Sequence, residues 1–360
     1  MDQYQYAILQ YSRGCPYHCD FCDVTALFGY RPRTKTADQI IAELEVFASS
    51  NKFFSVLFAD DNLIGNKKEL KSELLPALIQ WRKEKQPALS FSTQLTINLV
   101  DDPELMEMLL EAGFRHIFIG VETPEEAGLV ASRKQQNTKR DLLQNISRLH
   151  QAGFAVVGGF IIGFDTDTPS IFQRQIDFIQ ASGIVLATVN MLKAPPGTEL
   201  HERMKREGRL TERFSFQEIS TNFMPKMDRD VLYRGFRRVL HSVYSPEYAY
   251  MRSIKFLQEY NKSPAVENDI PMQSSAKYIG PLLRAIYYLG IVGKERRYFW
   301  KLIGWALVNR PTMIDWAVLN AVAIYQLRHL YLSYYDQAGE ALPELTSGDD
   351  REQLEIFKAI

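Results

Sequence analysis

The first two hundred residues alternate between short apolar runs and longer segments with helical spacing, and this alternation constrains the fold most. The runs predicted as strands are residues 6–10, 53–59, 89–95, 116–121, 156–162 and 186–192. The segments predicted as helices are residues 38–48, 67–85, 103–112, 138–152, 169–182 and 199–207. Gly113 and Gly153 stand where helices end in a left-handed cap, and Asp102 followed by Pro103 marks a helix start.

Six strand–helix units predict an α/β fold with a parallel sheet covered by helices. Because six units are too few to close an eight-stranded barrel, we expect a partial (β/α)6 barrel with parallel strands. In such sheets the functional site lies at the carboxyl ends of the strands. The side chains that follow each strand are therefore the first place to look for chemistry.

The alternation ends near residue 207, and a mainly helical C-terminal domain is expected beyond it. We predict a barrel over residues 1–207, a bridging segment over 208–230, the helical domain over 231–345 and a polar tail over 346–360. A chain of 360 residues is long enough for two such parts, since single cores seldom exceed about 250–300 residues.

Charge and hydropathy exclude several classes of protein. Lys and Arg number 42 against 43 Asp and Glu, so the net charge of −1 gives no electrostatic reason to expect a nucleic-acid partner. The N-terminus shows no signal-peptide pattern, and no stretch reaches the roughly 18 apolar residues of a membrane span. We expect a cytoplasmic protein with reduced thiols.

All three cysteines of the chain, Cys15, Cys19 and Cys22, follow the first predicted strand directly. Three thiolates on one loop can bind a soft metal centre. A zinc site would need a fourth ligand, for which His18 is the only nearby candidate. An iron–sulfur cluster held by three cysteines would instead leave one iron open to bind another molecule. Both kinds of centre are compatible with the spacing.

The C-x3-C-x2-C spacing after the first strand, with Phe21 just before the last cysteine, resembles the radical S-adenosylmethionine (SAM) superfamily. The resemblance implies that Cys15, Cys19 and Cys22 bind a 4Fe–4S cluster whose remaining iron chelates the amino and carboxylate groups of SAM. It also implies a low-potential electron donor, such as flavodoxin or ferredoxin, as a partner.

The same resemblance implies several SAM contacts. Phe21 would lie against the adenine. Asp60 and Asp61, in Ala59-Asp60-Asp61-Asn62, stand where the family often has Gly-Gly-Glu and would receive the SAM amino group, although helix capping accounts for such a cluster nearly as well.

Further expected contacts lie on the later strands. Glu122, after the fourth strand, would contact the ribose, and Lys134 would pair with the SAM carboxylate or lie at the surface. Gly159, Ile161 and Gly163 match the family's G-x-I-x-G pattern beside the adenine. No catalytic side chain is expected, because the cofactors supply the chemistry.

Longer segments resemble the cobalamin-associated branch of this superfamily, and the helical remainder resembles the C-terminal domain of a subgroup that includes hopanoid C-2 methylases. These segments are residues 10–16, 58–62, 158–165, 194–198, 207–210 and 222–225. Such relatives usually carry an N-terminal cobalamin-binding domain with an Asp-x-His-x-x-Gly motif, which this sequence lacks. Cobalamin would then come from a separate domain or chain, or the chain is a fragment, or the enzyme works without it.

The predicted function is reductive cleavage of SAM to a 5′-deoxyadenosyl radical for C–H functionalisation, with methylation as one outcome. The substrate would be a small molecule or a lipid. The aromatic and basic run at residues 296–301 suits a lipid at a membrane surface, but a helix packed on the barrel would carry the same residues. The alternatives are a non-catalytic iron–sulfur electron carrier and a zinc-binding interaction module.

Overall fold

The computed structural model describes residues 6–50, 55–85, 89–211, 214–215, 220–262 and 279–337. Its main feature is a six-stranded sheet in the order β1-β4-β5-β6-β7-β8, in which every pair is parallel. The strands are β1 (Tyr6–Leu9), β4 (Ser55–Phe58), β5 (Ser90–Gln94), β6 (Phe114–Glu122), β7 (Ala155–Ile162) and β8 (Leu186–Met191). All six predicted strands are present, and the predicted partial barrel is confirmed.

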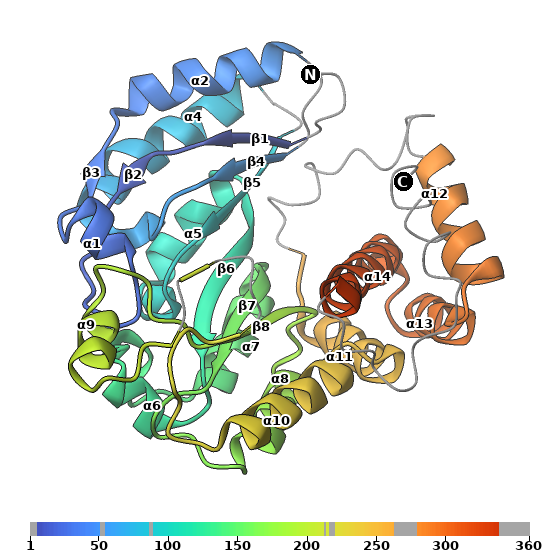
Figure 1. Ribbon diagram of the computed structural model, residues 1–360. Coiled ribbons are helices and arrows are strands. Elements are labelled where there is room, and N and C mark those ends of the chain that lie inside the picture. The colour runs from blue at the N-terminus through green and yellow to red at the C-terminus, as the bar shows by residue number, and fades with distance from the viewer. Residues whose placement is uncertain are drawn as a thin grey trace.

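Each strand of this sheet pairs with the next one along the chain, so β1 and β8 are left at the two edges. The crossover helices cover the outer face of the sheet (Figure 1). They include α2 (Ala37–Ser50), α4 (Leu75–Lys85), α5 (Pro103–Glu111), α7 (Leu142–Ala152) and α8 (Ile171–Ser182). After β8 comes α9 (Glu199–Arg206), which lies near the cysteines instead (Figure 1). Sequential parallel pairing brings the carboxyl ends of all six strands to one rim.

The core between sheet and helices is built around three phenylalanines on neighbouring strands. Phe58, Phe91 and Phe114 are fully buried, with ring centroids 4.9–5.4 Å apart. Edge-on and tilted aromatic pairs at this separation contribute about 0.5–1.5 kcal/mol each beyond their area burial. They fix β4, β5 and β6 relative to one another near the amino ends of β5 and β6.

Helix boundaries follow the expected signals at most ends. Asp102 caps α5 by accepting from the Leu105 amide, and Gly153 ends α7 in the left-handed region. The predicted start of α7 at residue 138 is wrong, because Asp141 caps the helix and a short 3-10 turn, η4 (Gln135–Asn137), precedes it. That turn becomes part of the rim.

Short elements around the cysteines were not predicted. They are β2 (Ser12–Arg13), which pairs antiparallel with β3 (Arg33–Thr34), and the single-turn helices α1 (Val24–Phe28) and α6 (Glu126–Ala131). Elements of two to six residues are too short to show a hydrophobic period.

The region after the barrel is helical, as predicted. Its helices are α10 (Arg229–Val243), α11 (Pro246–Glu259), α12 (Ile279–Ala285), α13 (Arg296–Asn309) and α14 (Ile314–Gln337). α10 nevertheless shares the barrel core: Leu232, Phe236 and Val239 join its buried cluster, and Gly235 lies directly against the Phe172 ring of α8. The proposed boundaries at 207 and 230 stay predictions, and the tail at 346–360 lies outside the described residues.

A second buried cluster joins α11, α13 and α14 to the opposite end of the barrel. Phe256, Tyr260 and Trp316 pack together there with Ala155 and Val185, which stand at the start of β7 and just before β8. These helices therefore pack against the amino ends of the later strands and leave the carboxyl rim to other contacts. Within the described ranges, no helix is long and apolar enough to cross a membrane.

Candidate functional site

The cysteine loop, residues 14–23, connects β2 to α1 and is tied to distant parts of the chain. The Asp20 amide donates to the carbonyl of Ser132 at 3.1 Å, and the Leu200 amide of α9 donates to the carbonyl of Asp20 at 2.8 Å. Gly14 adopts a φ of +103°, and a Cβ there would lie 2.8 Å from the Arg31 carbonyl oxygen. The entry to the loop therefore requires glycine.

Asp60 anchors the chain just before this loop. Its buried carboxylate accepts from the Ser12 amide and hydroxyl, both at 2.5 Å, and from the Tyr11 amide at 3.0 Å. Burial raises the pKa of Asp60, although these donors favour the charged form. Both oxygens of Asp60 bind residues that lie just before the cysteine loop. Asp60 therefore positions this loop.

Asp61, the next residue, presents a different environment. One side of its carboxylate accepts from the Gly14 amide, and its Oδ2 atom is buried with no hydrogen-bond partner in the part of the chain that the structure describes. Burial raises the pKa of this carboxyl group. A buried acceptor with no partner is costly unless a donor arrives, so Asp61 is suited to receive an ammonium or hydroxyl group.

The three cysteines are free, and each is partly exposed. Burial raises the pKa of Cys15 and Cys19 and raises that of Cys22 to about 12, so the metal-free thiols are neutral at pH 7. Metal binding would release their protons. No group of three or more His, Cys, Asp or Glu side chains among the described residues is arranged to hold a metal ion. Thiolates that each bind a different iron of a cluster need not converge on one point.

A buried ion pair lies beside the cysteines. Lys134 Nζ and Glu122 Oε1 are 2.5 Å apart, and both residues are less than a tenth exposed. Burial disfavours the charged lysine, but Glu122 and the nearby thiols outweigh it, so the pKa of Lys134 lies above its ordinary value. The structure thus brings together two predicted SAM contacts that lie twelve positions apart.

Glu122 holds its place through a strained backbone. Its φ is +68°, which is uncommon for any residue other than glycine, and the β6–β7 register shifts beside it. Gly120 makes room for this arrangement, since a Cβ there would lie 2.3 Å from Glu122 Oε1. Such strain is frequent at functional sites.

Aromatic and apolar side chains form the other wall. Phe21 packs edge-on against Phe164 at 6.2 Å, and both contact a small buried cluster that Ile161 also joins. Gly159 leaves room for the Phe118 ring, because a Cβ at this position would lie only 2.7 Å from the ring. Gly163 has a φ of +108°, and its amide donates to Asp167 at 2.8 Å.

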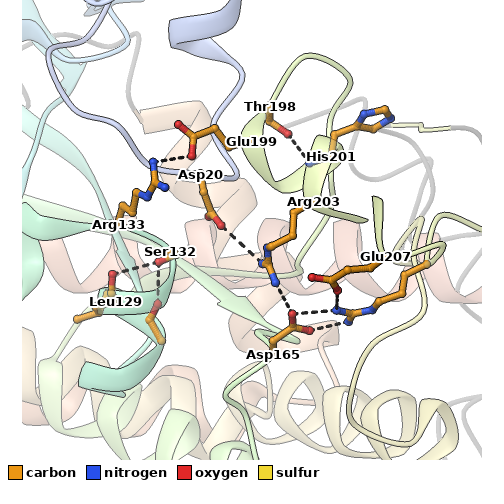
Figure 2. Close-up of polar contacts among 12 residues, drawn as sticks. Asp20, Leu129, Ser132, Arg133, Asp165, Thr198, Glu199, His201, Arg203 and Glu207 are labelled. Carbon is orange, nitrogen blue, oxygen red and sulfur yellow. Dashed lines mark hydrogen bonds and ion pairs between the residues drawn. The ribbon is translucent and has the colours of Figure 1, made fainter. Parts of the chain in front are cut away.

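A charged network fastens the loop from the side of α9. Figure 2 shows Arg203 between Asp20 and Asp165, with its nitrogens 3.6 Å and 2.5 Å from these carboxylates. Arg209 pairs with Asp165 as well, at 2.6 Å. Burial opposes the charge on Asp165, but Arg209 and Arg203 hold the pKa of this carboxyl group below its usual value.

The sequence did not single out Arg203, Asp165, Gln136 or Asn62 as site residues. Gln136 and Asn62 each reach a cysteine sulfur through a side-chain amide, at 3.6 Å and 3.8 Å. Asn62 stood in a quoted motif, so its place after β4 was a usable signal. Arg203 lies far from the cysteines in the sequence, on an ordinary amphipathic helix that offered no signal.

Comparison with known families identifies the class of this fold and site. Residues 9–179 match the radical SAM superfamily, and residues 198–338 match a domain of unknown function, DUF4070. The chain belongs to the radical SAM superfamily, and the matched range includes Cys15, Cys19 and Cys22.

Among curated proteins, the chain is similar to the hopanoid C-2 methylase of Rhodopseudomonas palustris, with 35% identity over 83% of this chain and 56% of that protein. It is also similar to an uncharacterised methyltransferase of Synechocystis, with 36% identity over 68% of this chain and 46% of that protein. The chain thus spans about half the length of these relatives.

Solved structures show the same fold. The radical SAM methyltransferase TsrM from Kitasatospora setae, with cobalamin and a [4Fe-4S] cluster bound, superposes with a TM-score of 0.53 at 14% identity, over 90% of this chain and 61% of that one. The cobalamin-dependent enzyme OxsB superposes with a TM-score of 0.53 at 14% identity, over 98% of this chain and 57% of that one.

The Arg203 network predicts a measurable effect on the cysteine loop. In Arg203→Gln the Asp20 amide should exchange its hydrogen roughly three- to tenfold faster, because a partly exposed charged contact of about 0.6–1.5 kcal/mol is lost. Arg209 still pairs with Asp165, so no carboxylate there is stranded. Hydrogen-exchange mass spectrometry measures the change. Arg206→Gln, an exposed position of the same helix, is the control, and equal protection in both variants would contradict the assignment.

Proposed function

We propose that this chain is a radical SAM enzyme that holds a 4Fe–4S cluster on Cys15, Cys19 and Cys22. The observation that carries the proposal is the placement of three free thiols beside the buried Glu122–Lys134 pair at the carboxyl rim of a radical SAM domain. When bound, a cluster reduced by an external electron donor would supply the one electron that cleaves SAM into methionine and a 5′-deoxyadenosyl radical, and that radical would remove a hydrogen atom from the substrate.

The residues present suit a cluster in the chemistry of their donors. Thiolates are the ligands that iron–sulfur clusters require, and none of the three sulfurs is used in a disulfide. Each is only partly exposed, and the positive charge of Lys134 favours the thiolate form of all three. The chain would contribute three ligands and exclude water.

For SAM itself, we assign different roles to two neighbouring aspartates. Asp61, whose buried Oδ2 has no partner among the described residues, would accept from the SAM amino group, while Asp60 serves the loop. Lys134 would pair with the SAM carboxylate and Glu122 would contact the ribose. The adenine would lie against the wall that includes Phe21 and Ile161, where the Gly159 and Gly163 segment ends β7.

Methylation is the outcome that the relatives favour, since the hopanoid C-2 methylase matches most of this chain. Cobalamin is a candidate cofactor because the solved structures of TsrM and OxsB contain it. We propose that a separate domain or chain would supply it. An electron donor such as flavodoxin or ferredoxin completes the expected set of partners. Hydrogen abstraction needs no acid or base, so no side chain is assigned that role.

Cluster binding and SAM cleavage can be tested together. Anaerobically reconstituted wild-type protein should bind iron and sulfide and release 5′-deoxyadenosine when reduced with SAM present, whereas Cys15→Ala, Cys19→Ala and Cys22→Ala should each lose both properties. Metal analysis and chromatography measure them.

His18→Ala is the matched control for this test. The His18 ring stacks on Tyr30 at 4.0 Å, so the change leaves the cysteines in place. A cluster on three cysteines should survive it, while a zinc site with His18 as fourth ligand would lose its metal. If the protein binds the cluster but never cleaves SAM, the proposal that it is an enzyme is contradicted. The alternative of a non-catalytic electron carrier would then be favoured.

The second prediction separates the two aspartates. Asp61→Asn should weaken SAM binding about tenfold, because a charge-assisted hydrogen bond of about 1.5 kcal/mol is reduced. Asp60→Asn should instead lower the thermal stability of the chain, because Ser12 and Tyr11 lose a charged acceptor. Isothermal titration with reconstituted protein and a melting curve measure the two effects. The reverse pattern would contradict the assignment.

We further propose that the substrate is lipid-like and is met at a membrane surface on the cytoplasmic side. Exposed apolar side chains gather on the C-terminal helices, and α13 adds basic residues at its start. On α12, on the segment 286–292 that follows it and on α13, the large exposed apolar residues are Leu282, Leu283, Tyr287, Ile291, Val292, Trp300, Leu307 and Val308. Such a combination is typical of helices that lie on lipid.

The third prediction tests this surface. A Leu307→Asp and Val308→Asp double variant should bind anionic liposomes at least tenfold more weakly than wild type, since each apolar side chain contributes about 1.5–3 kcal/mol on burial. Val46→Asp is the control, because Val46 is 68% exposed on α2, away from these helices. Wild-type protein that does not sediment with liposomes would overturn the proposal.

A further inference from the structure

Two buried side-chain amides reach the cysteine loop from different elements. Asn62 follows β4, and its Nδ2 atom lies 3.8 Å from the Cys15 sulfur. Gln136 lies in η4, and its Nε2 atom is 3.6 Å from the Cys19 sulfur. Both distances are within the range of N–H···S hydrogen bonds. The two residues are 1% and 7% exposed, so water does not compete strongly for these donors.

The Asn62 amide turns its donor group toward the sulfur and its oxygen toward the end of β5. Its Oδ1 atom lies 3.5 Å from the Thr96 hydroxyl, whose single proton has a closer acceptor in Asn98 Oδ1 at 2.6 Å. An oxygen turned to Thr96 leaves the NH₂ group on the side of Cys15. The NH₂ group of Asn62, and not its oxygen, therefore faces the cysteine loop.

Gln136 is held at the site at a cost. Its Oε1 atom is buried without a hydrogen-bond partner among the described residues, and an unsatisfied buried amide oxygen destabilises the fold. An apolar residue would avoid that cost. The Nε2 group of Gln136 contacts the Cys19 sulfur, and an apolar side chain could not make this contact.

A hydrogen-bond donor beside a cluster sulfur changes the reduction potential of the cluster. Adding one electron, delivered by a low-potential donor, makes the cluster and its sulfurs more negative without breaking a bond. An N–H group pointing at the sulfur stabilises that added charge, so it favours the reduced form. Hydrogen bonds to the sulfurs are among the factors that set the potentials of iron–sulfur clusters.

We propose that Asn62 and Gln136 are positioning residues that raise the reduction potential of the cluster held by the cysteine loop. This inference rests on the cluster assignment made under the proposed function. The third ligand differs, since Cys22 accepts from the backbone amide of Val24 instead of a side-chain amide. The potential is thus adjusted at Cys15 and Cys19, from two parts of the rim.

The test is a redox titration of the reconstituted full chain, followed by electron paramagnetic resonance without SAM. Asn62→Leu and Gln136→Met remove each donor at similar size. Each should make reduction about tenfold less favourable, which is about 59 mV toward more negative potential for one electron. The double variant should show roughly the sum, because the donors act on different sulfurs.

Two further kinds of variant keep the test decisive. Asn62→Asp and Gln136→Glu preserve shape and polarity but replace the donor with an acceptor, so the potential should fall at least as far. Gln10→Leu is the control: the Gln10 amide donates to the Ala59 carbonyl at 3.1 Å, close to the loop entry but on no sulfur. Its potential should match that of wild type.

The outcomes separate this inference from the proposed function. Unchanged potentials in cluster-loaded Asn62 and Gln136 variants would overturn the inference alone. The expected shifts in a protein that cleaves no SAM would support the inference while the proposed activity fails. Wild-type protein that binds no iron at all would overturn both.

Discussion

The carboxylate of Asp60 is the contact on which the rest of the site depends. It joins the end of β4 to the exit of β1 by accepting from the backbone of Tyr11 and Ser12, at the point where the chain turns into the cysteine loop. Since a buried carboxylate needs such donors, the two strands and the loop entry are fixed as one unit. Gly14 then makes the turn that no other residue fits without strain.

From that anchor the loop passes over the carboxyl rim and is held by each strand end in turn. Asn62 after β4, Asn98 after β5, Gln136 beyond β6 and the Phe164–Asp165 segment after β7 all contact it or its partners. α9 adds Leu200 and Arg203, which belong to the match with the domain of unknown function. At least the beginning of that domain therefore supports the cysteine loop, while α11, α13 and α14 pack at the amino ends of the strands.

Much of the fold could be predicted, because long apolar runs with clear periods report their own structure. The six strands and their parallel order followed from this pattern, and so did the helix cap at Asp102. The elements that shape the site could not be predicted, since β2, β3, α1 and α6 are too short to show a period and are held by distant contacts. The core shared by α10 and the barrel was also hidden, because amphipathic spacing does not say which partner a helix meets.

The site residues divide in the same way. The cysteines were predicted from their spacing after the first strand and Glu122 from the family resemblance, whereas only the fold shows that Lys134 pairs with Glu122. Asp60 and Asp61 looked equivalent in the sequence, and their roles separate only when hydrogen bonds are known. Arg203 was missed because a pair formed across the fold leaves no local trace. Site residues that form a local motif can be predicted from the sequence, whereas contacts between residues far apart in the sequence require the structure.

The central claim is that the cysteine loop holds three thiolates of a cluster beside a SAM-binding rim. The most direct test is the electron paramagnetic resonance spectrum of the reduced, reconstituted chain recorded before and after SAM is added. We expect iron and sulfide in the ratio of a 4Fe–4S cluster and a spectrum that changes with SAM, because SAM would bind the open iron. Stoichiometric zinc, or a cluster whose spectrum ignores SAM, would contradict it.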